Sequence, residues 1–331
     1  MNIGMVRTAA ICATLVVIAG GCGGGGSGGG PVGTVTEFAI PTANSQPTGI
    51  TSGPDGNLWF TENNTNKIGK CTTAGVITEF TIPTANSGPY EITSGPDGNL
   101  WFTEINTNKI GKCTTAGVIT EFTVPTANSG PAGITTGPDG NLWFTEAAGK
   151  IAKCTTAGLI TEFTVPTANS GPSEIVSGSD GNLWFAEGGA GAPGVKVGRC
   201  TTSGTITEFM APGTGIFGIA AGPDGNLWFT EFYTAGIGRV TTTGTITEFA
   251  ATSGSGPNGI ASGPDGNLWF TQRGAPSGTG GTGIGRCTTA GVITVFPTKT
   301  AGATPYSITR GPDGNMWFTE NTANNIAKIV P

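Results

Sequence analysis

A ten-residue phrase, GPDGNLWFTE, recurs seven times along this chain with small changes, and this repetition constrains the fold more than any other feature. Each copy carries one Trp, and successive Trp residues are 42, 42, 41, 44, 41 and 48 residues apart. A period in the low forties with strand-like content is typical of a β-propeller blade. The seven residues are Trp59, Trp101, Trp143, Trp184, Trp228, Trp269 and Trp317. The repeat therefore predicts an all-β chain folded as a seven-bladed β-propeller of four-stranded blades.

The second repeat shows how four short strands are expected to form one blade. We place these strands at residues 90–94, 100–104, 109–114 and 118–124. Between the first two, GPDGN has the Pro, Asp and Gly of a tight turn, because Gly accepts the positive φ that other residues resist. The LWF run of the second strand is apolar on both faces, which suits a sheet packed between two neighbouring sheets.

The two ends of the repeat region predict how the ring closes. Residues 34–40, TVTEFAI, match the fourth strand of a blade, whereas residues 325–330, NIAKIV, match the third. The seventh blade therefore lacks a fourth strand of its own, and the N-terminal segment supplies one, which leaves no unpaired edge. Seven Phe residues at one position of the fourth strand support this count: Phe38, Phe80, Phe122, Phe163, Phe209, Phe249 and Phe296. The propeller is expected to span residues 33–331.

The segment before the repeats is expected to be an export signal. Residues 1–21 contain Arg7 and a short apolar run that ends in small residues before Cys22. This order resembles a bacterial lipoprotein signal peptide, whose Cys becomes lipidated. Residues 22–32 are then the lipidated Cys22 and a flexible Gly-rich tether. An ordinary secretory signal cut nearby is the alternative, and both predict an exported protein.

Localisation and partners follow from the same segment and from the charge of the chain. The apolar run is too short to span a membrane, so we expect the membrane to be reached through the lipid anchor alone. The protein is then a cell-envelope lipoprotein, or a secreted protein if the alternative holds. The net charge of −6 argues against a nucleic-acid partner, which requires basic stripes.

Five of the seven Cys residues occupy one position in the third strand, where two other repeats have Val240 and Ile329. The position therefore takes small apolar side chains, and we expect buried free thiols. A disulfide between blades is disfavoured, because packed sheets lie about 10 Å apart and a disulfide needs Cα atoms within about 7 Å. One Cys per blade and the absence of His also argue against zinc. The five are Cys71, Cys113, Cys154, Cys200 and Cys287.

The carboxylates divide into repeated and unrepeated positions. Each of the seven repeats has one Asp in its first turn. Six repeats have a Glu in the fourth strand, and six have a Glu at the end of the second strand. Val295 and Gln272 replace the seventh Glu of the fourth and second strands, and only Glu91 and Glu174 lie elsewhere. A residue found in every blade is most simply scaffold, so residues that break the repeat are the better site candidates. A ring of second-strand carboxylates that holds Mg²⁺ or Ca²⁺ is an alternative, with candidate ligands Glu62, Glu104 and Glu320.

The alternation of strand direction within a blade separates two ends of the ring. The PDGN and TTAG turns are nearly constant and share one end, whereas the connections at the other end vary. Five aromatic residues outside the repeated positions are all expected at the variable end: Tyr90, Phe217, Phe232, Tyr233 and Tyr306. Because variable loops on a rigid scaffold often bind ligands, this end is the predicted binding face. The alternative is that these aromatic residues plug the channel and the glutamates bind loop backbone.

Three phrases that recur in order, PxGITxGPDGNLWFTE, IGK/RCTT and GVITEF, closely resemble the virginiamycin B lyase (streptogramin lyase) family. The resemblance covers nearly all of residues 33–331 and implies a seven-bladed propeller. It also implies an enzyme that uses Mg²⁺ and a general-base His to open the ester-linked ring of streptogramin B antibiotics by elimination. The family typically carries His in PHGI, at the start of the first strand. That position here reads Thr48, Tyr90, Ala132, Ser173, Phe217, Asn258 and Tyr306.

The chain contains no His, which places the implied chemistry in question. Proton abstraction needs a group that titrates near neutral pH, and His does this best. Glu320, Glu62 and Glu91 are the candidate substitutes, provided that burial or a like charge raises their pKa values. The sixth and seventh repeats, which break the pattern at Gln272 and Arg310, form the predicted specialised pocket.

The first functional hypothesis is a membrane-anchored propeller that binds a small molecule, glycan or peptide at its variable end. The second is a carbon–oxygen lyase of the streptogramin type, and the third is a structural lipoprotein that acts through protein contacts. The absence of His favours the first and third. The candidate binding residues are Tyr90, Glu91, Glu174, Phe217, Tyr233, Asn258, Gln272, Arg273, Tyr306 and Arg310.

Overall fold

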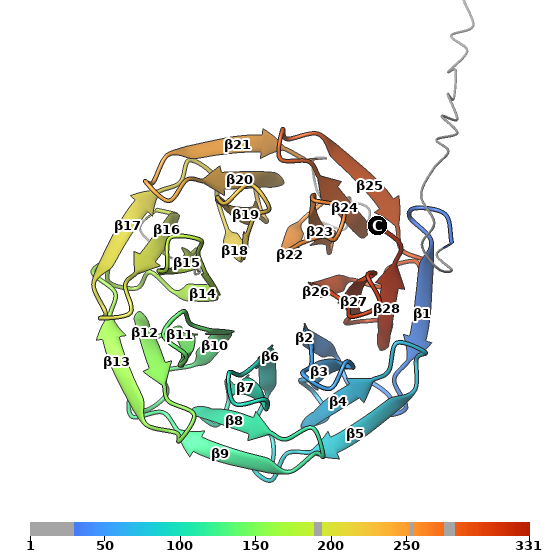
Figure 1. Ribbon diagram of the computed structural model, residues 1–331, viewed down its shortest axis with the longest axis horizontal. Coiled ribbons are helices and arrows are strands. Elements are labelled where there is room, and N and C mark those ends of the chain that lie inside the picture. Colours follow the sequence, from blue (N-terminus) through green and yellow to red (C-terminus); the bar gives the residue numbers. More distant parts are fainter. Residues whose placement is uncertain (1–29, 189–193, 252–254, 275–281) are drawn as a thin grey trace, which may run out of the picture. The chain divides into compact units, whose positions relative to one another are not determined.

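A computed structural model describes residues 30–188, 194–251, 255–274 and 282–331. The propeller unit extends from Pro31 to Pro331 and consists of seven four-stranded antiparallel sheets, one per blade (Figure 1). The seven-bladed prediction is therefore confirmed. The proposed signal peptide and Cys22 lie outside the described residues. Within the described ranges, no helix is long and apolar enough to cross a membrane.

Each blade contains strands A to D, numbered from the channel outward. The A strands are β2 (Pro47–Ser52), β6 (Pro89–Ser94), β10 (Pro131–Thr136), β14 (Pro172–Ser177), β18 (Ile216–Ala221), β22 (Pro257–Ser262) and β26 (Pro305–Arg310). The B strands are β3 (Leu58–Glu62), β7 (Leu100–Glu104), β11 (Leu142–Glu146), β15 (Leu183–Glu187), β19 (Leu227–Glu231), β23 (Leu268–Gln272) and β27 (Met316–Glu320). We number the blades 1 to 7 in this order.

The outer strands complete the blades. The C strands are β4 (Lys67–Cys71), β8 (Lys109–Cys113), β12 (Lys150–Cys154), β16 (Lys196–Cys200), β20 (Gly236–Val240), β24 (Gly283–Cys287) and β28 (Asn325–Ile329). The D strands are β5 (Ile77–Thr81), β9 (Ile119–Thr123), β13 (Ile160–Thr164), β17 (Ile206–Met210), β21 (Ile246–Ala250), β25 (Ile293–Pro297) and, for blade 7, β1 (Val35–Ala39). The predicted strand limits agree with these bounds to within one residue.

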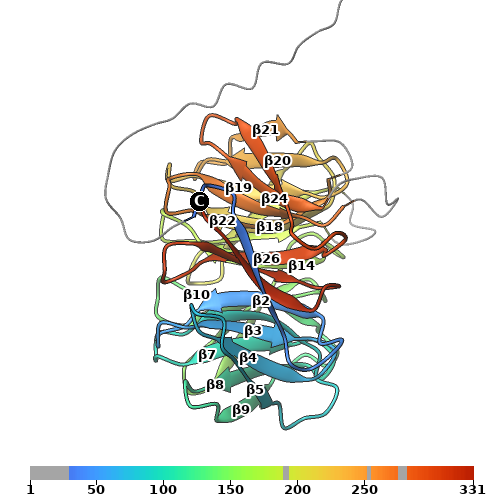
Figure 2. The same cartoon turned by 90° about the vertical axis from the view of Figure 1, so that its right-hand side faces the viewer.

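Strand β1 closes the ring by pairing with the C-terminal strand β28. The register joins Val35 to Ile329 and Ala39 to Asn325, and Figure 2 shows β1 beside the C-terminal blade. Phe38 stacks on Trp317 with ring centroids 5.5 Å apart, which is the arrangement of the Trp–Phe pairs within the other blades. Blade 7 is therefore built like its neighbours from two distant parts of the chain, as predicted.

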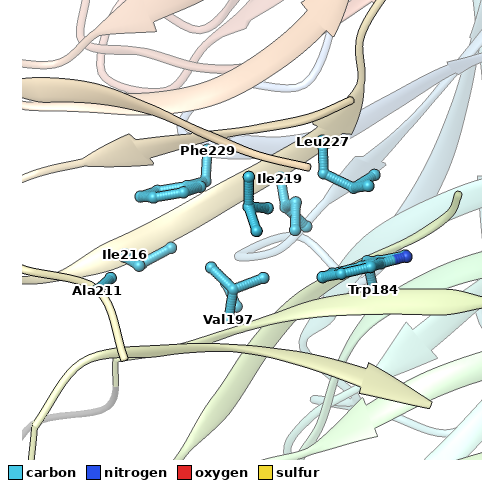
Figure 3. Close-up of a cluster of buried hydrophobic side chains, with 9 residues drawn as sticks. Trp184, Val197, Ala211, Ile216, Ile219, Leu227 and Phe229 are labelled. Carbon is cyan, nitrogen blue, oxygen red and sulfur yellow. The ribbon is translucent and has the colours of Figure 1, made fainter. Parts of the chain in front are cut away.

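The hydrophobic core lies between blades rather than in one central mass. Trp184 and Val197 of blade 4 pack against Leu227 and Phe229 of blade 5 (Figure 3). Six further clusters repeat this arrangement around the ring. All seven Trp side chains are fully buried. The apolar LWF runs therefore serve as predicted, since each B strand is covered on both faces.

The turn between strands A and B holds the buried Trp in place. In blade 1, Gly56 adopts φ 74°, and the Asp55 carboxylate accepts a 3.0 Å hydrogen bond from the Trp59 indole nitrogen. Gly53 has no room for a side chain, because an added Cβ would lie 2.4 Å from the Trp59 ring. The phrase GPDGNLW is thus one structural device that each blade repeats.

The five Cys side chains at the repeated position are buried free thiols, as predicted. Burial raises the pKa of the Cys71 thiol to about 12, so this thiol stays protonated and unreactive at neutral pH.

The two ends of the ring differ as the sequence predicted. Pro89 pairs with Glu104 and Ser94 pairs with Leu100, so strand A begins where strand B ends. We call this the loop end, because it carries the variable B–C and D–A connections, and we call the opposite end the turn end. Since Val35 pairs with Ile329, at the finish of strand C, the chain enters the propeller at the turn end.

Candidate functional site

A small cavity lies in the channel near the loop end and is lined by five of the seven A strands. Its volume is about 60 Å³, enough for a few water molecules or one small chemical group. Six of the residues predicted from sequence line it together, namely Tyr90, Glu91, Glu174, Phe217, Asn258 and Tyr306. The structure therefore brings the main binding candidates to one place.

A bulge at the start of each A strand turns these residues toward the channel. In blade 2 the pairing with strand B is irregular between Pro89 and Ile92, so the two intervening residues are Tyr90 and Glu91. The Tyr90 carbonyl accepts a 2.7 Å hydrogen bond from Thr61 of blade 1, which fixes the bulge to the preceding blade. The same Thr-to-carbonyl bond recurs around the ring, for example from Thr271 to Tyr306.

Blade 4 replaces this Thr with Ala186, and a different residue takes over its role. The Ser173 hydroxyl donates a 3.2 Å hydrogen bond to the Phe217 carbonyl, which is the carbonyl that a blade 4 Thr would hold. The loss of one donor is thus matched by the gain of another within the same blade. Ser173 is therefore both a cavity residue and a support for Phe217.

Glu91, which is buried, and Glu174, which is half-buried, form a carboxyl pair in the cavity. They take the place of the repeated Gly in blades 2 and 4, and blade 3 between them presents only Ala132 and Gly133. Burial, and then the negative charge of Glu174, raise the pKa of Glu91 well above its ordinary value. Burial raises the pKa of Glu174 to about 7, against the effect of the hydrogen bond that it shares with Glu91. The pair therefore holds at least one proton at neutral pH.

Two tyrosines from blades 2 and 7 meet beside the carboxyl pair. The Tyr90 and Tyr306 hydroxyl oxygens are 2.5 Å apart, and their rings pack edge to face with centroids 6.1 Å apart. Blade 1 lies between these blades and contributes only the small Thr48 at the same position. Burial raises the pKa of both phenols, so the hydroxyls stay neutral and offer hydrogen bonds.

Asn258 and Arg273 both contact Tyr306 but differ in their relation to the cavity. The Asn258 amide nitrogen donates a 3.1 Å hydrogen bond to the Tyr306 carbonyl. Its amide oxygen is buried and has no partner in the described parts of the chain. The Arg273 guanidinium stacks over the Tyr306 ring at 4.4 Å from the centroid, yet Arg273 does not line the cavity.

A second aromatic group continues the cavity wall toward the loop end. Phe217 packs edge to face against Phe232 and Tyr233, with ring centroids 5.4 and 6.4 Å away. Tyr233 is 63% exposed, so the group reaches from the cavity to the surface. The five aromatic residues predicted at this end thus form two groups, one inside the channel and one at its rim.

The Glu residues that end the B strands lie elsewhere. Glu62, Glu104 and Glu320 belong to three different blades and are each 0% exposed. In the described ranges, no three His, Cys, Asp or Glu residues gather in a way that could hold a metal ion. These three carboxyls therefore do not fit a shared Mg²⁺ or Ca²⁺ site, and we derive no chemical step through a metal.

Two further binding candidates also lie apart from the cavity. Gln272 is 2% exposed and occupies the same buried position as the B-strand glutamates. Arg310 is exposed at the last position of β26, next to the turn end, and its carbonyl accepts a hydrogen bond from Ser52. Of the residues predicted for a specialised pocket in blades 6 and 7, Asn258 and Tyr306 line the cavity, and Arg273 contacts it only through the Tyr306 ring.

Two polar cavity residues, Ser173 and Ser307, were not among the binding candidates predicted from sequence. Ser307 lines the cavity in blade 7, where four other blades have Gly at the same position. The replacement of that Gly by Ser was a signal of the kind that identified Glu91 and Glu174. The longest parts of the blade 4 and blade 6 loops, residues 189–193 and 275–281, lie outside the described residues.

Comparisons with known proteins agree with the sequence resemblance. Residues 30–210 and 192–331 match the virginiamycin B lyase family. Virginiamycin B lyase from Staphylococcus aureus has 38% sequence identity and a TM-score of 0.83, over 90% of this chain and 99% of that chain. The same values apply to a catalytically inactive His-to-Ala variant of that enzyme with quinupristin. Hydrazine synthase from Kuenenia stuttgartiensis shares the fold alone, at 17% identity and a TM-score of 0.73 over 88% of this chain and 97% of that one.

Proposed function

The chain belongs to the virginiamycin B lyase family, and from this premise we propose that it binds a small molecule at the loop end of its channel without cleaving it. The observation that carries the proposal is the cavity described above. Five of the seven positions that resemble the His-bearing position of the lyases line it here, and none of them is His. These positions thus carry a different set of side chains from the one that the resemblance implies.

The cavity and its rim suit binding better than catalysis. Aromatic walls and a few convergent polar groups are typical of small-molecule sites. Phe217 and Tyr233 offer apolar surface, while Glu91, Glu174 and Asn258 offer hydrogen-bond acceptors. A ligand with a ring system at the rim and one polar group in the cavity would use both parts.

An elimination reaction is the second candidate, and the carboxyl pair is the observation that favours it. A general base works best when its pKa lies near the operating pH, and the pKa of Glu174 is about 7. In this alternative, Glu174 takes the proton that His takes in the streptogramin lyases. The inactive His-to-Ala relative argues against it, because loss of one His abolishes catalysis there.

Quinupristin, the compound in the structure of the relative, tests the proposal. We expect it to raise the melting temperature of the wild type and of Val118→Ser, a matched change at the turn end, but not that of Phe217→Ser/Tyr306→Ser. Chromatography after incubation with Mg²⁺ should recover the antibiotic intact. If the wild type produces ring-opened antibiotic and Glu174→Gln produces none, the protein is a lyase instead. The absence of any shift in the wild type would contradict binding of a streptogramin-type ligand.

We also propose that the propeller is exported and anchored through Cys22. The composition of residues 1–32 supports this proposal. Intact mass spectrometry of protein from the membrane fraction is expected to show a lipid-modified chain that begins at Cys22. Cys22→Ser should release the propeller from the membrane. A soluble wild type with an unmodified N-terminus would refute the anchor.

A further inference from the structure

The cavity is rich in hydrogen-bond acceptors. Three residues with acceptor oxygens line it, namely Glu91, Glu174 and Asn258. Asn258 is 6% exposed, and its oxygen is without a partner among the described residues. A buried polar atom without a partner destabilises a protein unless a ligand or water satisfies it. The unpartnered Asn258 oxygen thus indicates a missing donor, and this observation does not depend on the carboxyl pair.

The donor that best fits this cavity is a protonated amine. An alkylammonium group presents three N–H donors and one positive charge. The three acceptor groups match its three donors in number. The two of them that are carboxyls, when partly ionised, also provide the opposite charge. The aromatic rings of Tyr90 and Phe217 also line the cavity, and such rings attract cations. Since the volume is about 60 Å³, the cavity takes the head group while the rest of the ligand stays at the rim.

We propose that the channel cavity is a receptor for a primary ammonium group, held by Glu91, Glu174 and Asn258. This inference rests on the proposed binding function and names the chemical class of the ligand. The positive charge of Arg273 lies outside the cavity on the Tyr306 ring, so it does not compete for the carboxyl pair. The other titratable groups that face the pair are the neutral Tyr90 and Tyr306 phenols.

The test uses phenethylamine as the probe and 2-phenylethanol as its uncharged control. At pH 8 we expect phenethylamine to bind the full-length protein in a thermal-shift or calorimetric titration, and the alcohol to bind at least about tenfold more weakly. Glu91→Gln/Glu174→Gln should lose about tenfold or more in affinity. Glu104→Gln, which changes a buried carboxyl outside the cavity, should bind like the wild type. Acidification to pH 5.5 protonates the pair and should weaken binding of the amine.

Defined outcomes overturn the inference. Equal binding of amine and alcohol, or unchanged amine binding in the double variant, would show that the carboxyl pair does not recognise the charge. A response to Mg²⁺, Ca²⁺ or K⁺ that depends on the pair, without a response to the amine, would assign the site to an inorganic cation. If quinupristin binds and phenethylamine does not, the proposed function is supported and the proposed ammonium site is rejected. The reverse result keeps the ammonium site and removes the streptogramin-type ligand.

Discussion

A chain that begins at Pro41, and therefore lacks β1, is expected to lose cooperative folding. Five residue pairs join β1 to β28, and Phe38 covers one face of Trp317. Each backbone hydrogen bond contributes about 1 kcal/mol, and removal of a packed Phe costs about 3 kcal/mol or more. The sum is comparable with the ~5–15 kcal/mol stability of a whole domain.

The loss should also change how the protein associates. Without β1, the β28 edge is unpaired and open to strands from other copies. We expect circular dichroism melting to lose its sharp transition and size-exclusion chromatography to show oligomers or aggregates. A chain that begins at Pro31 is the matched control and should melt like the full-length protein. Added peptide of residues 31–41 should restore the transition, whereas a truncated protein that melts at the full-length temperature would disprove the closure.

The blade count and the closure could be predicted because they depend on residues that every blade repeats. Trp59 and its six equivalents set the period, and Phe38 identified β1 as a D strand without a blade. These positions are fixed by packing between neighbours of similar sequence, so one blade predicts the next. The physical rule is local, and the sequence contains seven copies of it.

The sequence predicted which residues line the cavity better than it predicted which of them contact one another. Glu91 and Glu174 were identified because they break the repeat, and the structure places both in the cavity. Their mutual contact depends on the curvature of the ring across Gly133, which no local pattern encodes. Arg310 broke the repeat as well, yet it lies at the turn end of β26. A break in a repeat thus identifies an unusual residue without identifying which end of the strand serves the site.

The sequence predicted the correct end of the ring for the glutamates that end the B strands, but it did not predict that their side chains are buried. The sequence puts Glu62 at the loop end of β3, which suggested a carboxylate available to a ligand. The structure turns the side chain into the protein, where Thr65 donates a hydrogen bond to one oxygen and the other has no partner in the described chain. Strand direction was inferred correctly, whereas the rotation of the side chain depends on the neighbouring strands.

The stability of the protein is expected to increase as the pH falls from 8.5 to about 5, which is unusual for an acidic protein. Burial raises the pKa of Glu62 to about 7 and that of Glu104 to about 8, and four further B-strand glutamates behave alike. Because these carboxyls bind protons more tightly when folded than unfolded, folding is favoured at low pH and this contribution is lost as pH rises through 7 to 8.

Other carboxylates set the lower limit of this range. Burial opposes the charge of Glu79, but hydrogen bonds from Thr42 and Lys67 prevail and lower its pKa. The turn residue Asp55 is similar, since hydrogen bonds from Trp59 and Asn57 outweigh its burial. Their stabilising effect is present above their unfolded pKa values and is lost as pH falls below about 4. The melting temperature should therefore be highest near pH 5.

Two Gln substitutions within blade 1 test this explanation with opposite expected signs. Glu62→Gln removes a charge that is costly when buried, so it should raise the melting temperature at pH 8.5 by about 2–5 °C and have little effect at pH 5. Glu79→Gln removes a carboxylate that accepts hydrogen bonds from Thr42 and Lys67, so it should lower the melting temperature at pH 8.5. Differential scanning calorimetry across pH 4–9 measures both.

Blade 6 already contains the change that this experiment makes. Gln272 occupies the buried position of Glu62, and in the same blade Val295 replaces the D-strand Glu and Gly283 replaces the C-strand Lys. Blades 5 and 7 also lack the C-strand Lys, with Gly236 and Asn325 in its place, but they keep both glutamates. Blade 6 therefore differs from them in lacking both carboxyls. The single copy of the repeated phrase that ends in Gln thus belongs to the blade that also lacks the D-strand Glu. A wild type that melts at a higher temperature at pH 8.5 than at pH 5, or a Glu62→Gln variant that is destabilised at pH 8.5, would refute the assignment of raised pKa values to the B-strand carboxyls.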